Sequence, residues 1–300
     1  MDNRELVERL LRSYQVNPRD GQNLPSRHAV GRITSDLLRL LFPGFFDDSA
    51  TAPTSAGRAT SELLDETANR LTREITRSLI YAPPPELKRQ GVGAAAQHLT
   101  IEILRRLADI RGILATDIEA AFNGDPAALS QDEVIVSYPF VETIAVQRVA
   151  HEMYLREIAL IPRMMTEWAH SRSGMDLHPG AQIGSYFFVD HCTGTVVGET
   201  SVIGSHVKMY QGVGLVARSL AAGQQLRGKK RHPTIADNVT IYAGATIVGG
   251  DTVVGEGSTI GASAFLTHSV PPNSLVLAED VRVRVINKDR HDVFEPDWTI

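Results

Sequence analysis

The sequence predicts an α+β protein in which an N-terminal α-helical domain is followed by a parallel β-helix. The main observation is that an aliphatic residue recurs at about every sixth position from Leu177 onward. A period of six fits neither the α-helix nor simple strand alternation. It is typical of β-helices, whose sides are short strands with the aliphatic residue pointing inward. The predicted inward positions are Leu177, Ile183, Val189, Val197, Ile203, Met209 and Leu215, then Ile235, Ile241, Ile247, Val254, Ile260 and Leu266.

Residues 1–173 form the predicted helical domain because their apolar residues follow helical spacing. Pro43-Gly44 and Pro83-Pro84-Pro85 mark helix ends, since proline and glycine favour turns. The small and polar residues 48–58 predict a linker. We expect helices near 4–14, 28–42, 64–79, 103–114, 140–160 and 162–172, the last with Pro162 in its first turn.

The predicted β-helix covers residues 174–274, and its period is interrupted at three places. Two extra residues follow Val189 and one follows Ile247, so we expect a bulge at each of these corners. Residues 216–234 are too many for one side and predict an extruded basic loop. The repeat then weakens, and residues 275–300 are expected to form a charged C-terminal tail.

The composition argues against several classes of protein. The 300 residues carry a formal net charge of −5, whereas nucleic-acid-binding domains are usually basic. No apolar run approaches the roughly 18 residues that a membrane span needs, and the N-terminus lacks the apolar core of a signal peptide. A single cysteine, Cys192, excludes an intrachain disulfide and fits a reducing compartment. We therefore expect a cytoplasmic protein that binds neither nucleic acid nor membrane.

Four motifs lie on the repeat: Asp176-Leu-His-Pro-Gly, Val189-Asp-His, Val197-Gly-Glu-Thr and Lys230-Arg-His-Pro. In this combination they resemble the serine acetyltransferases, and the resemblance covers residues 120–270. It implies a left-handed β-helix, packing of chains as trimers, and a frequent pairing of two trimers through the helical domains. It also implies transfer of an acetyl group from acetyl-CoA to L-serine, which gives O-acetyl-L-serine for cysteine biosynthesis.

The resemblance implies roles for individual residues. His191 falls on the catalytic histidine of the family, and Asp176 falls on the aspartate that pairs with it. The residues implied for serine binding are Arg231, His232, Asp190, Asp125 and Glu199. Those implied for CoA binding are Gly214, Ala217, Lys230, Ala243 and Gly261. No metal is expected.

The residue types suit this chemistry. Attack by a hydroxyl group needs a base, and histidine fits because its ordinary pKa of about 6.5 lies near neutral pH. A carboxylate on the other ring nitrogen would fix the tautomer. Asp176 and His191 are 15 residues apart, close to one coil of about 18, which predicts neighbouring positions. An isolated corner histidine would be an ordinary hydrogen-bonded residue, but this one has three companion motifs.

The basic loop residues are expected to serve binding. Arg231 offers a planar fork that suits the carboxylate of an amino acid, and His232 adds a donor. Lys229 and Lys230 fit a solvated basic loop and a contact with the phosphates of CoA equally well.

Other functions stay open at this point. The fold could transfer an acyl group to homoserine or a sugar, although the Arg-His-Pro motif disfavours a sugar. The chain could instead be an inactive regulatory partner of O-acetylserine sulfhydrylase. His191, His206 and His232 could suggest a zinc site, as in carbonic anhydrases built on the same repeat, but their spacing supports this weakly. Cys192 is expected to fill space, because direct attack by the acceptor needs no acyl-enzyme.

The resemblance also implies two partners and some differences. L-Cysteine is expected to inhibit by occupying the serine pocket. In this family a C-terminal isoleucine on an acidic tail inserts into O-acetylserine sulfhydrylase, and Ile300 fits that pattern; the alternative is a terminus without a role. The sequence departs from the family at Cys192, where glycine or alanine is usual, and at 213–219 and 275–279, which alters the expected CoA contacts.

Overall fold

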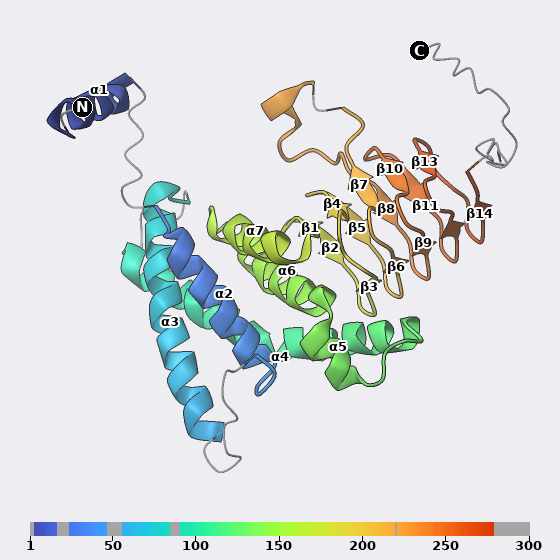
Figure 1. Ribbon diagram of the computed structural model, residues 1–300, viewed down its shortest axis with the longest axis horizontal. Coiled ribbons are helices and arrows are strands. Elements are labelled where there is room, and N and C mark those ends of the chain that lie inside the picture. The colour runs from blue at the N-terminus through green and yellow to red at the C-terminus, as the bar shows by residue number, and fades with distance from the viewer. Residues whose placement is uncertain (1–2, 17–23, 47–55, 85–90, 220, 279–300) are drawn as a thin grey trace, which may run out of the picture.

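The helical domain forms one end of the molecule (Figure 1). A computed structural model describes residues 3–16, 24–46, 56–84, 91–219 and 221–278. The helices are α1 (Asn3–Val16), α2 (Arg27–Leu41), α3 (Ala56–Tyr81), α4 (Val92–Gly124), α5 (Gln131–Ser137), α6 (Pro139–Leu155) and α7 (Ile161–Ser173). Each expected helix is present with shifted ends. The short α5 is not among the predicted helices, and α3 begins inside the expected linker.

Local sequence explains several helix ends. Ser26 caps α2 and Ser130 caps α5, each accepting a backbone N–H of the first turn on its hydroxyl oxygen. At the other end of the domain, α7 stops at Gly174, whose φ of 72° is a left-handed conformation that glycine adopts without strain. This turn leads directly into the first strand of the β-helix at Asp176.

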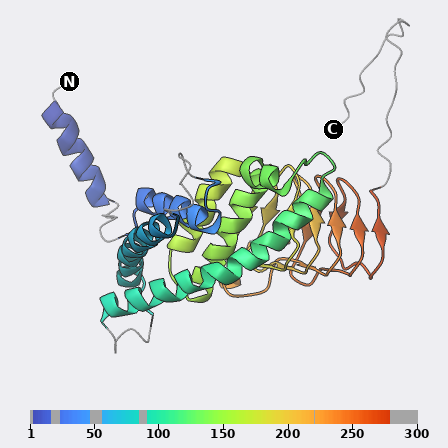
Figure 2. The same ribbon diagram turned by 90° about the horizontal axis from the view of Figure 1, so that it is seen from below.

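The β-helix consists of three parallel sheets that form its three sides (Figures 1 and 2). Sheet A has the order β1-β4-β7-β10-β13, sheet B the order β11-β8-β5-β2, and sheet C the order β14-β12-β9-β6-β3. Successive strands move from sheet to sheet, so the chain winds as the expected left-handed parallel β-helix. The strands are β1 (Asp176–Leu177), β2 (Gln182–Ile183), β3 (Phe188–Val189), β4 (Val196–Val197), β5 (Val202–Ile203), β6 (Lys208–Met209), β7 (Gly214–Val216), β8 (Thr234–Ile235), β9 (Thr240–Ile241), β10 (Thr246–Val248), β11 (Val253–Val254), β12 (Thr259–Ile260), β13 (Phe265–Leu266) and β14 (Leu275–Val276).

The predicted inward residues fill the β-helix. All of them except Ile183 are at most 6% exposed, which confirms the interpretation of the six-residue period. Ile183 is half-buried because it lies in the first coil, beside a groove between that coil and the helices. The buried residues of the helices and of the β-helix form one continuous core.

The irregularities of the period appear as corners of different length. Asp176 pairs with Val196, which is 20 residues later, because the intervening corner holds two extra residues. Val196 pairs with Gly214 after a regular 18 residues. The expected loop leaves the coil after β7 and returns at β8. Sheet C also continues in β14, which lies just beyond the expected end of the repeat at residue 274.

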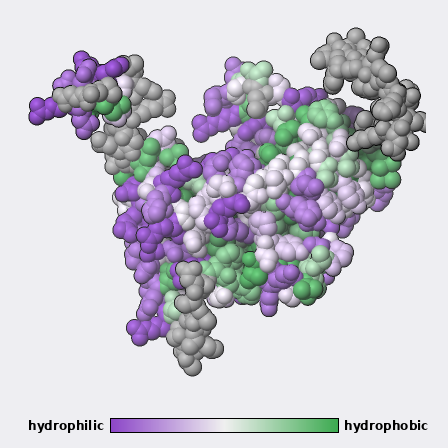
Figure 3. Space-filling view, in the orientation of Figure 1, coloured by the Kyte–Doolittle hydropathy of each residue, from purple (hydrophilic) through white to green (hydrophobic). Residues whose placement is uncertain are grey.

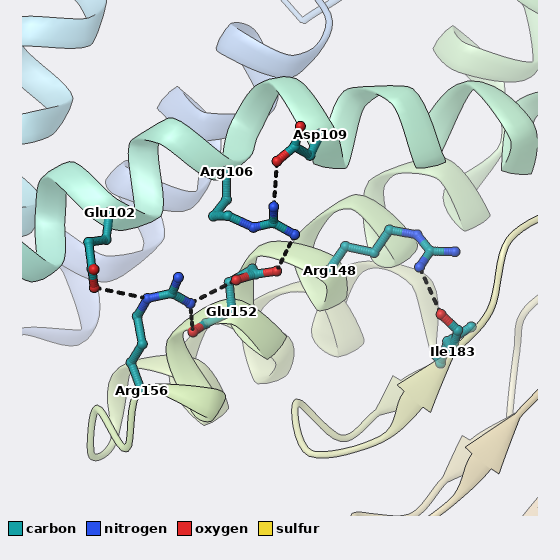
Figure 4. Close-up of polar contacts among 7 residues, drawn as sticks. All are labelled: Glu102, Arg106, Asp109, Arg148, Glu152, Arg156 and Ile183. Carbon is teal, nitrogen blue, oxygen red and sulfur yellow. Dashed lines mark hydrogen bonds and ion pairs between the residues drawn. The ribbon is translucent and has the colours of Figure 1, made fainter.

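Helices α4 and α6 cover the open edge of the first coil. Arg148 of α6 binds the carboxylate of Asp117 of α4 at 2.7 and 2.9 Å, and it donates to the carbonyls of Ile183 and Gly184 at 3.1 and 2.7 Å. Figure 4 shows Arg148 reaching from α6 toward the strand of Ile183. Asp117 in turn accepts the backbone N–H of Phe187 at 3.0 Å. The first coil therefore pairs its backbone with two helices.

The same two helices are joined by a second, more exposed network of ion pairs (Figure 4). Arg156 lies between Glu102 and Glu152, and Arg106 lies between Glu152 and Asp109. Alternating charges of this kind hold α4 and α6 side by side along the groove next to the first coil.

The surface differs between the two ends of the molecule. On the face in Figure 3, hydrophilic residues dominate the helical end, and more apolar residues lie over the β-helix. Helix α1 has no buried side chain among its described residues and lies apart from the other helices in both ribbon views. No helix of the described residues has the length and apolar character that crossing a membrane requires. The expected tail begins with β14, and its residues 279–300, including Ile300, lie outside the described residues.

We expect Asp117→Ala to lower the apparent free energy of unfolding by about 3–5 kcal/mol, because it leaves the buried Arg148 without its counter-charge. The side chains of Asp117 and Arg148 are 0% and 7% exposed. Urea denaturation at fixed protein concentration measures the change. The matched control is Asp251→Ala, which removes the exposed pair with Arg218 and should change stability by less than about 0.5 kcal/mol. A similar small effect in both variants would contradict the proposed role of the buried pair.

Candidate functional site

The corner between sheets C and A carries the predicted catalytic histidine. Asp190 follows β3, and the next two residues, His191 and Cys192, adopt positive φ angles of 58° and 56°. Residues other than glycine rarely hold this conformation, and such strain is frequent at functional sites. The side chain of His191 is 70% exposed, and its Nδ1 lies 3.7 Å from Oδ1 of Asp190. The corner thus presents an accessible imidazole with a carboxylate near one ring nitrogen.

Cys192 points into the core below this corner. It is 1% exposed, and its thiol contacts the carbonyl of Val189 at 3.6 Å. Burial, with a smaller effect of the Asp190 charge, raises the pKa of Cys192 to about 12. Because the thiolate is the nucleophilic form of cysteine, a neutral buried thiol is suited to filling space and not to attacking a thioester.

The end of α4 brings a second carboxylate to the corner of His191. Lys208 of β6 donates to the carbonyl of Gly124 at 2.5 Å, which fixes the last turn of α4 against the β-helix. The next residue, Asp125, accepts a hydrogen bond from the hydroxyl of Tyr138 at 2.5 Å. This bond holds the pKa of Asp125 below its ordinary value, and the charges of Lys208 and His191 act in the same direction. Asp125 is therefore an ionised carboxylate within electrostatic range of His191.

Asp176 lies on β1 and binds an arginine of the helical domain. Its register partner is Val196, and its carboxylate accepts two hydrogen bonds from Arg163 at 2.9 and 3.2 Å. Its predicted pairing with the catalytic histidine stays a prediction. Asp176, Glu167 and His170 lie close enough together to hold a metal ion. Because Arg163 already pairs with both carboxylates, the charge that would attract a cation is largely neutralised.

A second charged group lies at the corner between sheets A and B. Glu199, in the turn after β4, forms an ion pair with Arg231 and accepts the hydroxyl of Tyr154 at 2.8 Å. Burial alone would raise the pKa of Glu199, but these two hydrogen bonds hold it below its ordinary value. Since Tyr154 belongs to α6, the helical domain contributes to this corner as well.

His232 is held at this corner in one tautomer. The backbone N–H of Thr200 donates to its Nδ1 at 3.1 Å, so the ring proton lies on Nε2. The ring packs against Gly198, where a Cβ atom would come within 2.0 Å of it, so the position requires glycine. Burial, reinforced by the charge of Arg231, lowers the pKa of His232 to about 4. At neutral pH His232 is thus an uncharged donor.

The residues predicted to bind CoA are distributed along the β-helix. Lys230 is an exposed residue whose ammonium group donates to the carbonyl of Thr200 at 2.6 Å, and partial burial lowers its pKa. The contacts of all five predicted residues with CoA stay predictions. The other four are Ala243 and Gly261 at the corner of His191, Gly214 in β7 and Ala217 just after β7.

Within one chain the predicted residues form two separate groups. The first group, at the corner of sheets C and A, contains Asp125, Asp190 and His191. The second, at the corner of sheets A and B, contains Glu199, Arg231 and His232. One side of the coil separates the corners, which is on the order of 15–20 Å for about six residues. A single chain therefore holds the base and the carboxylate-binding residues apart.

Four residues at these corners are absent from the sequence-based predictions: Tyr138, Tyr154, His178 and Lys208. Their positions depend on which helix covers which corner, and the six-residue period does not contain that information. The sequence could have indicated His178 as a site residue, because His178 belongs to the Asp-Leu-His-Pro motif. Its Nδ1 accepts the N–H of Gly180 at 3.0 Å, its ring meets Tyr154 edge-on at 5.9 Å, and burial lowers its pKa.

The chain is similar in sequence to several proteins of one family. It is 41% identical over 266 residues to a serine acetyltransferase, designated plasmid, of Synechococcus elongatus, a match that covers 86% of this chain and 83% of that protein. It is also 41% identical to the serine acetyltransferase of Bacillus subtilis over 187 residues, which cover 62% of this chain and 83% of that protein. The longer match extends far beyond the hexapeptide repeat. No family model matches the chain.

Solved structures give the same result. The crystal structure of serine acetyltransferase isoform 3 of Entamoeba histolytica, in complex with cysteine, superimposes with a TM-score of 0.72 at 32% sequence identity. The match covers 86% of this chain and 84% of that chain. Isoform 1 of the same organism, in complex with L-cysteine, gives a TM-score of 0.71 at 33% identity.

We expect His232 to make the protein less stable in mild acid. Its pKa of about 4 in the folded state lies below the ordinary value of 6.5, so the unfolded state binds the proton more readily between these values. The free energy of unfolding should therefore fall as the pH drops from about 6.5 towards 4. In His232→Gln the loss between pH 7 and pH 5 should be smaller than in the wild type by about 1–2 kcal/mol.

Urea denaturation at both pH values measures this difference. The control is His98→Gln, because the side chain of His98 is 72% exposed on α4, and this variant should show the wild-type loss. Equal losses in all three proteins would rule out a neutral buried His232.

Proposed function

Because the chain belongs to the serine acetyltransferase family, we propose that it transfers the acetyl group of acetyl-CoA to the hydroxyl group of L-serine. The observation that carries the proposal is the exposed ring of His191, with Asp190 at 3.7 Å and Asp125 in electrostatic range. The products are O-acetyl-L-serine, a precursor for cysteine biosynthesis, and free CoA.

His191 acts as the general base in this proposal. Its imidazole takes the proton of the serine hydroxyl while the oxygen attacks the thioester carbonyl, and the tetrahedral intermediate then expels the CoA thiolate. The imidazolium returns the proton to the thiolate sulfur, so that the enzyme regains its initial state. Two carboxylates could orient the ring: Asp190, which is near Nδ1, and Asp176, which the family resemblance implies.

The carboxylate and ammonium groups of serine need binding residues of opposite charge. Arg231 and the neutral Nε2–H donor of His232 are proposed to bind the carboxylate, since a guanidinium fork matches two carboxylate oxygens. Asp125 and Asp190 are proposed to face the ammonium group. Glu199 holds Arg231 in position through their ion pair.

We propose that the two groups of residues meet between copies of the chain in a homotrimer. Sheet A lies between the two corners, so packing sheet A beside a neighbouring copy would bring His191 of one chain toward Arg231 of the next. Two apolar residues exposed on the outer face of this sheet support the assembly: Val196 is 38% exposed and Phe265 is 69% exposed. Joining of two trimers through the helical domains is proposed on the family resemblance alone.

L-Cysteine is proposed to inhibit the enzyme at the same site. It has the carboxylate and ammonium groups of serine, with a thiol in place of the hydroxyl, so both groups of binding residues would accept it. The relative from Entamoeba histolytica that forms a complex with cysteine supports this proposal. A cytoplasmic location and binding to O-acetylserine sulfhydrylase are proposed from the family resemblance.

We expect the purified protein to release CoA from acetyl-CoA only when L-serine is present, as measured with a thiol reagent. His191→Ala should lower kcat by about 10²–10⁴-fold, the usual contribution of a general base, with an unchanged circular dichroism spectrum. The matched control is His206→Ala. His206 has the same positive φ, 57°, at a different corner, and its loss should leave kcat unchanged.

Three outcomes would contradict the proposal. Full activity of His191→Ala would exclude the histidine as base. Turnover with homoserine or a sugar, but not with serine, would assign another acceptor. Equal inactivation by His206→Ala, together with stoichiometric zinc, would support the metal site instead.

We expect Phe265→Glu to dissociate the trimer, because it places a charge in an apolar interface. Sedimentation velocity should show a trimer or a dimer of trimers for the wild type and a species smaller than a trimer for the variant, and activity should be lost with the trimer. The control is Leu275→Glu, at a residue that is 66% exposed on sheet C, which should remain trimeric and active. A monomeric wild type, or a Phe265→Glu trimer, would refute the assembly through sheet A.

A further inference from the structure

A stacked pair of tyrosines continues the corner of His191 along the β-helix. The registers of β3, β6 and β9 align successive coils, so the residues that follow these strands, Asp190, Tyr210 and Tyr242, occupy equivalent positions. The rings of Tyr210 and Tyr242 are 5.1 Å apart and nearly parallel, with an angle of 8°. This spacing matches the distance of about 4.8 Å between neighbouring strands, so the backbone itself holds the rings in contact.

The stack is fixed at one end and open at the other. On the side of the helical domain, the ammonium group of Lys208 lies 4.7 Å from the centre of the Tyr210 ring and is itself held by the carbonyl of Gly124. In the coil after Tyr242 the equivalent residue is Gly261, which has no side chain to cover the ring. Tyr242 is 43% exposed. The column of aromatic rings therefore ends in an accessible tyrosine.

The position of this tyrosine suits a long acyl donor. Asp125 and Tyr138 occupy the helical side of the corner, so a donor whose thioester lies at His191 must extend in the other direction, over the later coils. Tyr242 lies two coils beyond Asp190, which is about 10 Å. The pantetheine arm of CoA, with its two amide groups, covers roughly 10–15 Å when extended. The adenine lies farther from the thioester than that.

We propose that Tyr210 and Tyr242 form an aromatic wall along which the pantetheine arm of the acyl donor lies, and that Tyr242 determines specificity for donors with this arm. The inference rests on the proposed acetyl transfer. A tyrosine ring offers an apolar face to the methyl and methylene groups of the arm, and its hydroxyl can bond to an amide. Ala243 and Gly261, the small residues beside the stack, leave room for the arm at this corner.

The test measures donor binding directly and through kinetics. Tyr242→Ala should raise the Kd of CoA in isothermal titration calorimetry, and the KM of acetyl-CoA, by about five- to tenfold. The KM of serine and kcat should change less than twofold. Tyr242→Phe keeps the stacked ring and should stay closer to the wild type. With S-acetyl-N-acetylcysteamine, a donor that ends after its first amide, the wild type and Tyr242→Ala should have equal kcat/KM.

The matched control is Tyr186→Ala. Tyr186 also belongs to a stacked pair, with His206 at 4.2 Å, but it lies at the corner between sheets B and C, so its loss should leave CoA binding unchanged. An unchanged Kd of CoA in Tyr242→Ala would overturn the inference, and so would an equal loss with the short thioester or dissociation of the oligomer. Failure of the proposed function is distinguishable, because it would appear as a wild type without turnover whose CoA affinity still depends on Tyr242.

Discussion

The β-helix depends on how its first coil is closed. A parallel sheet that ends at an edge strand leaves a row of N–H and C=O groups without partners, and burying such groups unpaired is costly. Here the buried ion pair of Arg148 with Asp117 meets that need, since it binds the carbonyls of Ile183 and Gly184 and the N–H of Phe187. Both side chains are almost completely buried, so neither can leave without exposing the other charge to an apolar core. The ion pair therefore fixes the helical domain on the coil in one orientation.

That orientation also determines what reaches the two corners. Helix α4 continues for two turns beyond Asp117 and brings Asp125 to the corner of sheets C and A. Helix α6 continues beyond Arg148 and brings Tyr154 to Glu199 at the corner of sheets A and B. The helices that close the coil thus supply a carboxylate to one corner and a hydroxyl group to the other. Stability and site geometry are coupled because the same two helices carry both.

The period of the sequence predicted the β-helix well because every coil places an aliphatic residue at the same inward positions, so the pattern recurs along the chain. It could not predict the contacts of the outward residues. Lys208 lies on β6 and Tyr138 directly precedes α6, and their partners Gly124 and Asp125 lie at the end of α4, whose placement depends on tertiary packing. The motifs also did not predict that the candidate residues lie at two corners, because this depends on which corner of the coil each motif occupies. The pairing of Asp176 with His191 stays a prediction.

The corner of His191 differs from the others between sheets C and A in a way that explains its exposure. Six residues connect β3 to β4, whereas four connect β6 to β7, β9 to β10 and β12 to β13. In two of the short corners the residue after the strand is a tyrosine, and the rings of Tyr210 and Tyr242 stack on each other. The two extra residues force positive φ angles at His191 and Cys192, which turn the imidazole outward and the thiol inward. The stacked tyrosines of the regular corners therefore form a wall, and the longer corner between β3 and β4 places the projecting imidazole beside it.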